Sequence, residues 1–362
     1  MSATNSIPNT DRLNYVNIGL MLLSCLVAFF VPFELFLFSY AVLGPAHYLT
    51  EISWLHERKY FSKGKYDYIF LGLAGLLLFF VLYVDRIFPD AHIFTGKNVM
   101  QSNFATSLIF IAFICGLAMV VLKDSFARLI AFIVIIAISA FSHTPGLALF
   151  FSTFLPTLVH VYLFTLLFML YGSLKSRSKS GYLSCVIMLL CPLLFILITP
   201  SALPSGAYTF NAYNFFKAVN ESMLQLFNPD IFHKSFDTVD QYKAYVHSVI
   251  YESNAGLTVM RFIAFAYTYH YLNWFSKTSV IKWHQVPKKR LIVIGVLWAA
   301  AVGFYFYKYE IGFHVLFLLS FLHVFLEFPL NHVTFIGIFQ ETRSILTGKP
   351  VAVVAKSGSK KK

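Results

Sequence analysis

Four histidines stand inside long apolar stretches of the chain, where a helix that crosses a bilayer rarely carries an ionisable side chain. They are His47, His160, His270 and His323, whereas the other histidines lie in or beside predicted loops or near the ends of the last span. Neutral imidazole is the commonest ligand of transition metals in proteins. The four rings therefore predict a metal site, provided that the fold brings them together.

Two acids and one amide accompany these histidines. Glu51 and Glu327 each follow a histidine of the set by four residues, and Asn273 follows His270 by three, so each lies one helical turn from a ring. A ligand histidine needs its second ring nitrogen held by a carboxylate or carbonyl. We therefore expect a catalytic role for all three, orienting a ring on their own helix or on another. As alternatives to a metal site, the histidines could simply form hydrogen bonds between helices, and the two acids could form a proton path.

The composition predicts a polytopic membrane protein. Of 362 residues, 58% are apolar and only 12% are charged, with 41 phenylalanines, a profile far from that of a soluble domain. The net charge of +12 has the sign of a nucleic-acid-binding protein, but the basic residues cluster in short loops beside apolar runs, where membrane lipids attract them. We therefore expect contacts with membrane lipids and none with nucleic acid.

Apolar runs long enough to cross about 30 Å of hydrocarbon predict an all-α bundle of about ten transmembrane helices. Residues 1–347 then form a single transmembrane domain. The predicted spans are Val16–Phe33, Glu34–Trp54, Tyr68–Val84, Phe104–Leu122, Ala127–Phe141, Ala148–Gly172, Tyr182–Ile198, Gly256–Ser276, Leu291–Tyr307 and Ile311–Phe339.

Basic residues give the predicted orientation of the bundle. With the N-terminus inside, 21 lysines and arginines fall on the inner side and 7 on the outer side, as the positive-inside rule requires when both termini are cytoplasmic. The four histidines then lie on even-numbered spans, all of which run inward. Each is 12 to 14 residues from the start of its span, and at 1.5 Å per residue all four lie roughly 18–21 Å below the outer surface.

Two segments and three prolines interrupt the pattern of plain spans. Residues 200–253 form a long outer connection, which we expect to fold as short helices over the outer face, a solvated excursion being the alternative. The basic tail 348–362 is rich in Lys, Ser and Gly and is expected to be disordered. Pro45, Pro156 and Pro329 each lie within six residues of a histidine of the set, and a proline inside a span kinks it and frees a carbonyl.

The residues around the four histidines resemble motifs of the Brp/Blh-type membrane β-carotene 15,15'-dioxygenases of bacteria and archaea. That family opens with a Gly-Leu-Pro-His-Gly-Ala-x-Asp-like motif, and its other motifs are similar to shorter stretches here. The similar stretches in this chain are Leu43-Gly44-Pro45-Ala46-His47-Tyr48-Leu49-Thr50-Glu51, Val159-His160, Tyr269-His270-Tyr271 through Trp274, and Leu322-His323 with Glu327. The resemblance implies a helical bundle that binds non-haem iron, as Fe(II), through the histidines and cleaves a carotenoid with dioxygen.

We therefore expect an integral protein of the bacterial inner membrane that takes a carotenoid from the bilayer and cleaves it to retinal-like aldehydes. A lipid desaturase or hydroxylase is one alternative, although such sites use HxxxH and HxxHH spacings that this chain lacks. A transporter is another, but no internal repeat supports it. A haem-binding electron carrier would place histidine pairs on shared helices at two depths, and here each helix supplies one histidine at a single depth.

Overall fold

The structure, a computed structural model, describes residues 9–87, 98–277 and 286–350. Within these ranges the chain is helical and contains no strand. The all-α class predicted from the sequence is therefore confirmed. Most of the predicted basic tail, residues 351–362, lies outside the described residues.

Long helices make up the body of the bundle, and two of them change their hydrogen-bonding pattern along their length. One composite helix consists of α2 (Pro32–Phe38), the π-helix η1 (Ser39–Leu43) and α3 (Gly44–Glu57), and the other of α7 (Pro145–Leu149), the π-helix η5 (Phe150–Phe164) and α8 (Thr165–Ser176). The other long helices are α1 (Asn9–Phe30), α4 (Asp67–Ile87), α5 (Asn98–Val121), α6 (Ser125–Ile138), α9 (Lys179–Leu197), α13 (Asn254–Ser276), α15 (Lys288–Tyr307) and α16 (Tyr309–Thr347).

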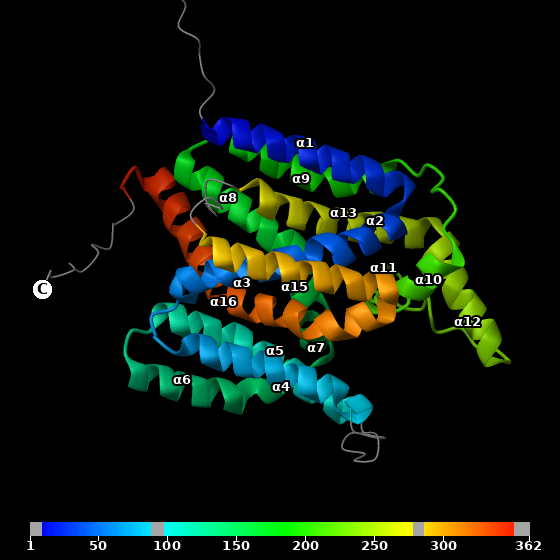
Figure 1. The fold of residues 1–362 in the computed structure, drawn as a ribbon, viewed down its shortest axis with the longest axis horizontal. Helices are drawn as coiled ribbons and strands as arrows, with labels where there is room; N and C mark the ends of the chain where they lie inside the picture. The colour runs from blue at the N-terminus through cyan, green and yellow to red at the C-terminus, as the bar shows by residue number, and fades with distance from the viewer. Residues whose placement is uncertain (1–8, 88–97, 278–285, 351–362) are drawn as a thin grey trace, which may run out of the picture.

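The long helices lie side by side in an elongated bundle (Figure 1). Helices α1 and α9 run along one edge and α4, α5 and α6 along the other, with α3, α13, α15 and α16 between them. The start of α1 and the end of α16 lie at the same end of the bundle, at the left in Figure 1. This arrangement agrees with a chain that crosses repeatedly and has both ends on one side.

Among the residues that the structure describes, seven helices are long and apolar enough to cross a membrane, so a polytopic helical membrane protein is confirmed, whereas the count of ten stays a prediction. The seven are Thr10–Phe30, Gln101–Val121, Ser125–His143, Pro145–Ser176, Lys179–Leu197, Lys288–Tyr307 and Tyr309–Thr347. A further apolar helix over Asp67–Tyr83 is shorter. The two other predicted spans correspond to the composite helix ending in α3 and to α13, and these carry more polar side chains.

The α-helical pattern is replaced near two of the three prolines. Pro45 is the second residue of α3, and α3 begins directly after the π-helix η1. Pro156 lies inside η5, a π-helix of 15 residues. Proline has no N–H for the carbonyl four residues earlier, and in a π-helix the bonds link residues five apart instead. At Pro329 no such change occurs, because α16 continues as one α-helix of 39 residues.

Apolar packing divides the described bundle into two cores. One joins α1, α2, α9 and α13 and includes the fully buried Phe265. The other joins α3, α4, α5 and α16 and includes the fully buried Phe328. Side chains of η5 belong to both, since Leu158 packs in the first core and Leu155 in the second. The helices that carry the four histidines therefore meet where the two cores adjoin.

A buried arginine connects three segments at the end of the bundle that carries the connection 200–253. Arg261 on α13 is 1% exposed, and its Nε donates a hydrogen bond to the carbonyl oxygen of Phe29 at 3.1 Å. Its Nη2 donates to the carbonyl oxygen of Pro200. Because the C-terminal end of a helix carries partial negative charge, the guanidinium also stabilises the end of α1.

The connection 200–253 folds over one end of the bundle, at the right in Figure 1. It forms the short helices expected, namely α10 (Ala207–Tyr213), α11 (Lys217–Phe227), α12 (Val239–His247) and the π-helix η6 (Ser248–Glu252). Between α10 and α11, Phe216 packs against Phe36 and Phe313 with ring centroids 4.9 and 5.0 Å apart. The segment is thus held on the bundle by aromatic contacts.

The orientation can be checked with reporter fusions. Reporters placed after Lys65 and after Lys179 are expected to lie in the cytoplasm, because both follow predicted inner ends of helices, and a reporter near Asp230 is expected outside. Paired reporters that are active only in the cytoplasm or only outside measure this directly. The reverse pattern would reject the orientation and, with it, the common depth of the histidines.

Candidate metal centre

The four predicted ligand rings meet inside the bundle. His47 on α3, His160 on η5, His270 on α13 and His323 on α16 are each at most 7% exposed. Nε2 of His47 lies 3.0 Å from Nε2 of His270, and Nε2 of His160 lies 3.2 Å from Nε2 of His323. The ring centroids of His160 and His270 are 4.9 Å apart. One histidine from each of four helices thus joins a single cluster.

Three of the four rings form a group that could hold a single metal ion. One nitrogen each from His47, His160 and His323 lies within 4.8 Å of the others, whereas His270 lies outside this group and contacts it through Nε2 of His47 at 3.0 Å. At metal–nitrogen distances of about 2.1 Å, ligand atoms at right angles are about 3.0 Å apart and opposite ones about 4.2 Å. The contacts of 3.0 and 3.2 Å therefore have the separation of adjacent ligands.

The two predicted acids lie within the cluster, in different positions. Oε2 of Glu327 is 3.1 Å from Nδ1 of His160, so this carboxylate reaches across to η5 rather than to the histidine of its own helix. Oε2 of Glu51 is 3.0 Å from Nε2 of His47, the nitrogen that faces the other rings. Neither contact has the direction of a hydrogen bond, and neither oxygen has another partner among the described residues. Glu327 is placed to hold a ligand ring, and Glu51 lies among the donor atoms themselves.

Thr165, rather than Asn273, contacts the second ring nitrogen of His270. Oγ1 of Thr165 lies 2.7 Å from Nδ1 of His270. Asn273 is 3% exposed and lies one turn further along α13, and its Oδ1 has no partner among the described residues. The predicted role of Asn273 in orienting this ring therefore falls to the threonine.

Sequence reasoning missed Thr165 because it assumed an α-helix. Five residues after His160, Thr165 would lie about 140° around an α-helix from it. The π-helix η5 has a wider turn, which brings residues five apart toward one side. The residues of η5 that line the adjoining cavity lie four and five positions apart, as a turn wider than that of an α-helix gives, namely Ser152, Pro156, Thr157, His160 and Val161.

A second contact that the sequence did not indicate is an aromatic one, and it supports the ring of His323. The ring of Tyr48 stacks on the His323 imidazole with centroids 4.2 Å apart and planes at 24°. The hydroxyl of Tyr48 lies 2.9 Å from that of Tyr271. Position 48 directly follows a histidine of the set, and this adjacency was the available signal.

The charges of the cluster favour a cation at its centre. Buried carboxylates are costly unless a positive charge accompanies them, and Glu51 and Glu327 are 3% and 1% exposed. Lys277, the first residue after α13, interacts electrostatically with both acids. Burial lowers the pKa of its ammonium to about 8, although the two carboxylates raise it in part. With both carboxyls ionised, one negative charge remains beside Lys277, and a divalent cation held by the neutral imidazoles would more than offset it. The donor set therefore fits a divalent transition metal.

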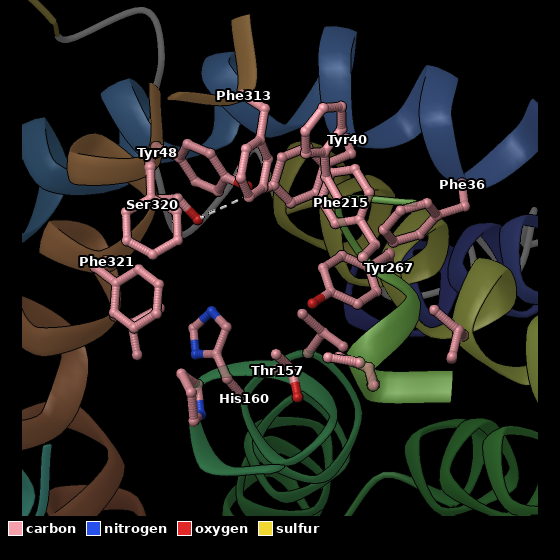
Figure 2. Close-up of a pocket in the computed structure, with 18 of the residues that line it drawn as sticks. Phe36, Tyr40, Tyr48, Thr157, His160, Phe215, Tyr267, Phe313, Ser320 and Phe321 are labelled. Carbon is pink, nitrogen blue, oxygen red and sulfur yellow. Dashed lines mark hydrogen bonds between the residues drawn. The ribbon is translucent and has the colours of Figure 1, made fainter. Parts of the chain in front are cut away.

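A cavity of about 160 Å³ adjoins the cluster on the side of α10 and α11. Figure 2 shows His160 and Thr157 at its floor, with Tyr267, Phe313 and Phe321 around the open space. The walls come from the composite helix ending in α3, from η5, α13 and α16, and from the segment between α10 and α11. An organic molecule in this cavity would touch His160 and reach the edge of the candidate metal centre.

Comparison with known proteins gives no match: no protein-family model, no curated protein and no solved structure matches the chain. The resemblance to the Brp/Blh-type dioxygenases therefore rests on the short motifs alone.

Removing one ring is expected to remove the metal. His47, His160, His270 and His323 replaced singly by Ala should each lose most bound metal, because each helix supplies one donor. His233→Ala serves as the control, since this side chain is 69% exposed and pairs with Asp230. Metal analysis of the purified variants measures the outcome, and equal metal content in all five would reject the site.

Loss of the Thr165 hydroxyl is expected to weaken metal binding without abolishing it. Thr165→Val keeps the shape of the side chain but removes the contact with Nδ1 of His270, and loss of such an outer partner lowers metal affinity about 10–100-fold. Thr165→Ser keeps the hydroxyl and should bind nearly as the wild type does. Competition with a chelator gives the affinities, and equal values for the two variants would show that the hydroxyl does not hold the ring.

Proposed function

We propose that this protein is an iron-dependent membrane oxygenase that acts on a lipophilic substrate taken from the bilayer. The observation that supports it best is the convergence of four buried imidazoles and two carboxylates directly beside an aromatic cavity. The motif resemblance suggests Fe(II) as the metal, dioxygen as the co-substrate and a carotenoid, cleaved to retinal-like aldehydes, as the specific substrate. It also suggests the bacterial inner membrane as the location.

In this proposal His47, His160, His270 and His323 hold the iron. When bound, iron supplies the electrons with which dioxygen is activated. Oε2 of Glu327 lies 3.1 Å from Nδ1 of His160, so a small rotation of either side chain would let the carboxylate accept a hydrogen bond from this ring and hold it. The contacts of Glu327 with His160 and of Thr165 with His270 would keep these two rings in the tautomer that presents Nε2 to the metal.

The apolar surroundings of the cluster serve the same reaction. Dioxygen and a lipid both dissolve in hydrocarbon, so both can reach a centre buried at membrane depth without crossing water. The cavity wall is formed by aromatic rings such as Phe36, Phe313 and Phe321, which exclude water from reactive species. The side chains that line the cavity then determine which part of the lipid meets the metal.

A lipid hydroxylase or desaturase is the second candidate, and the size of the cavity favours it. A cavity of about 160 Å³ is similar to one that holds a benzene-sized molecule. A whole carotenoid does not fit within it, whereas a short stretch of an alkyl or isoprenoid chain does.

Carotenoid cleavage can be tested in a carotenoid-producing bacterial host. Expression of the protein should bleach the yellow membrane and yield aldehydes, and both effects should require iron and dioxygen. His160→Ala should leave the carotenoid intact because it removes a ligand that also lines the cavity, whereas His233→Ala should behave as the wild type does. Absorption spectra and mass spectrometry of extracted lipids measure substrate and product.

The result separates the candidates. Intact carotenoid beside fully iron-loaded protein would reject carotenoid cleavage and leave the second candidate. Folded protein that binds no iron under any condition would reject the oxygenase itself.

A further inference from the structure

We propose that the cavity beside the four histidines binds a lipid carrying a small uncharged oxygen group, a hydroxyl or a carbonyl, within a few bonds of the carbon that reacts. The proposal rests on the proposed function in taking the histidine cluster as the reacting centre. The binding itself can be measured without any reaction. Three properties of the cavity support it, namely its hydroxyl groups, its lack of charge and its size.

The cavity is lined by more hydroxyl groups than a pure hydrocarbon could use. These belong to Tyr40, Tyr48, Tyr213, Tyr267, Tyr271, Ser152, Thr157 and Ser320. Several are already engaged, as in the 2.9 Å contact between the hydroxyls of Tyr48 and Tyr271. A hydrocarbon would bury the remaining ones without offering a partner, which is unfavourable.

Tyr267 carries the most specific indication. Its side chain is 8% exposed, and its hydroxyl points into the open space near His160 (Figure 2). This hydroxyl forms no hydrogen bond within the described part of the chain, and its oxygen is accessible from the cavity, unlike that of Tyr213, which is buried without a partner. A ligand that covers the Tyr267 hydroxyl must offer it a partner, because buried hydroxyls normally have one. An oxygen atom of the ligand in this space would supply the missing hydrogen bond.

The oxygen group of the ligand must be uncharged. Among the described residues, the cavity is lined by aromatic, aliphatic, hydroxyl and histidine side chains, and by no lysine, arginine, aspartate or glutamate. A carboxylate or phosphate would enter this space without a counter-ion beside it, which is costly in apolar surroundings. A hydroxyl or carbonyl needs only hydrogen bonds, which the tyrosines provide.

The size and opening of the cavity place the oxygen group close to the reacting carbon. The volume of about 160 Å³ admits a benzene-sized group, so most of a long lipid must stay outside. Two lining residues are exposed, Ser152 on η5 and Ala218 on α11, and they mark the opening between these elements. Whichever end enters, a group bound at Tyr267 and a carbon at His160 belong to the same short portion of the ligand.

Three probes of equal chain length test the ligand class. Hexadecan-1-ol, hexadecane and hexadecanoate are added separately to the purified full-length protein in detergent, and native mass spectrometry counts the molecules retained. One hydrogen bond gained corresponds to about a two- to tenfold tighter binding, so the alcohol should be retained to that extent over the alkane. Hexadecanoate should bind less than the alcohol. Equal retention of alkane and alcohol, or preference for hexadecanoate, would overturn the proposal.

Matched variants test the position of the oxygen group. Tyr267→Phe keeps the ring and should lower retention of the alcohol about two- to tenfold while leaving the alkane unchanged. Tyr162→Phe is the control, because the Tyr162 hydroxyl donates to the carbonyl of Met188 at 2.9 Å, away from the cavity lining. Thr157→Trp places a large ring in the cavity and should reduce retention of the alcohol by occupying the space, even though the hydroxyl of Tyr267 is still present. Wild-type retention by Tyr267→Phe or by Thr157→Trp would reject this cavity as the binding site.

The same measurements separate this proposal from the proposed function. Protein without bound iron that still retains the alcohol through Tyr267 would uphold the ligand class while the oxygenase fails. Iron-loaded protein that retains none of the alcohol would uphold the metal centre and reject the ligand class.

Discussion

The cost of burying two carboxylates deep in an apolar bundle is the constraint on which the rest of the structure depends. Glu51 and Glu327 are almost completely buried, and in such surroundings a carboxylate needs a positive charge or a set of hydrogen bonds beside it. The arrangement around them provides four neutral imidazoles that can gather a divalent cation, with Lys277 at the edge. Without that cation, the negative charge would not be fully balanced.

This constraint accounts for the place of α13 at the centre of the bundle. Every residue from Ile263 to Tyr271 is buried, so the polar atoms of this helix face other helices and not lipid, as a membrane-embedded helix with polar side chains requires. The neighbouring helices α1 and α2 pack along it. Outer helices such as α15, which carry few buried side chains, supply the surface that lipid can contact.

The convergence of the four histidines could be predicted from the sequence because a histidine in an apolar run is unusual and because helices that run the same way place equal spacings at equal depth. The contacts of Glu327 and Thr165 could not be predicted, since they depend on how each helix is rotated about its axis, and an apolar sequence does not determine that rotation. The count of ten spans stays a prediction for a related reason. The polar residues that serve the site make α13 and the helix containing His47 less hydrophobic than a plain span.

The connection 200–253 could be recognised by its length. Its share of the cavity wall could not, because that share follows from the packing of Phe216 against Phe36 and Phe313.

The long π-helix makes the site unusually sensitive to the number of residues between Pro156 and His160. Each residue turns the chain by about 100° in an α-helix and by somewhat less in the wider turn of a π-helix, so shortening this stretch by one residue would still aim the imidazole at a different neighbour. Substitutions in η5 keep this count, whereas insertions and deletions change it. Natural variation in this helix should therefore replace residues freely on its outer face and almost never alter its length.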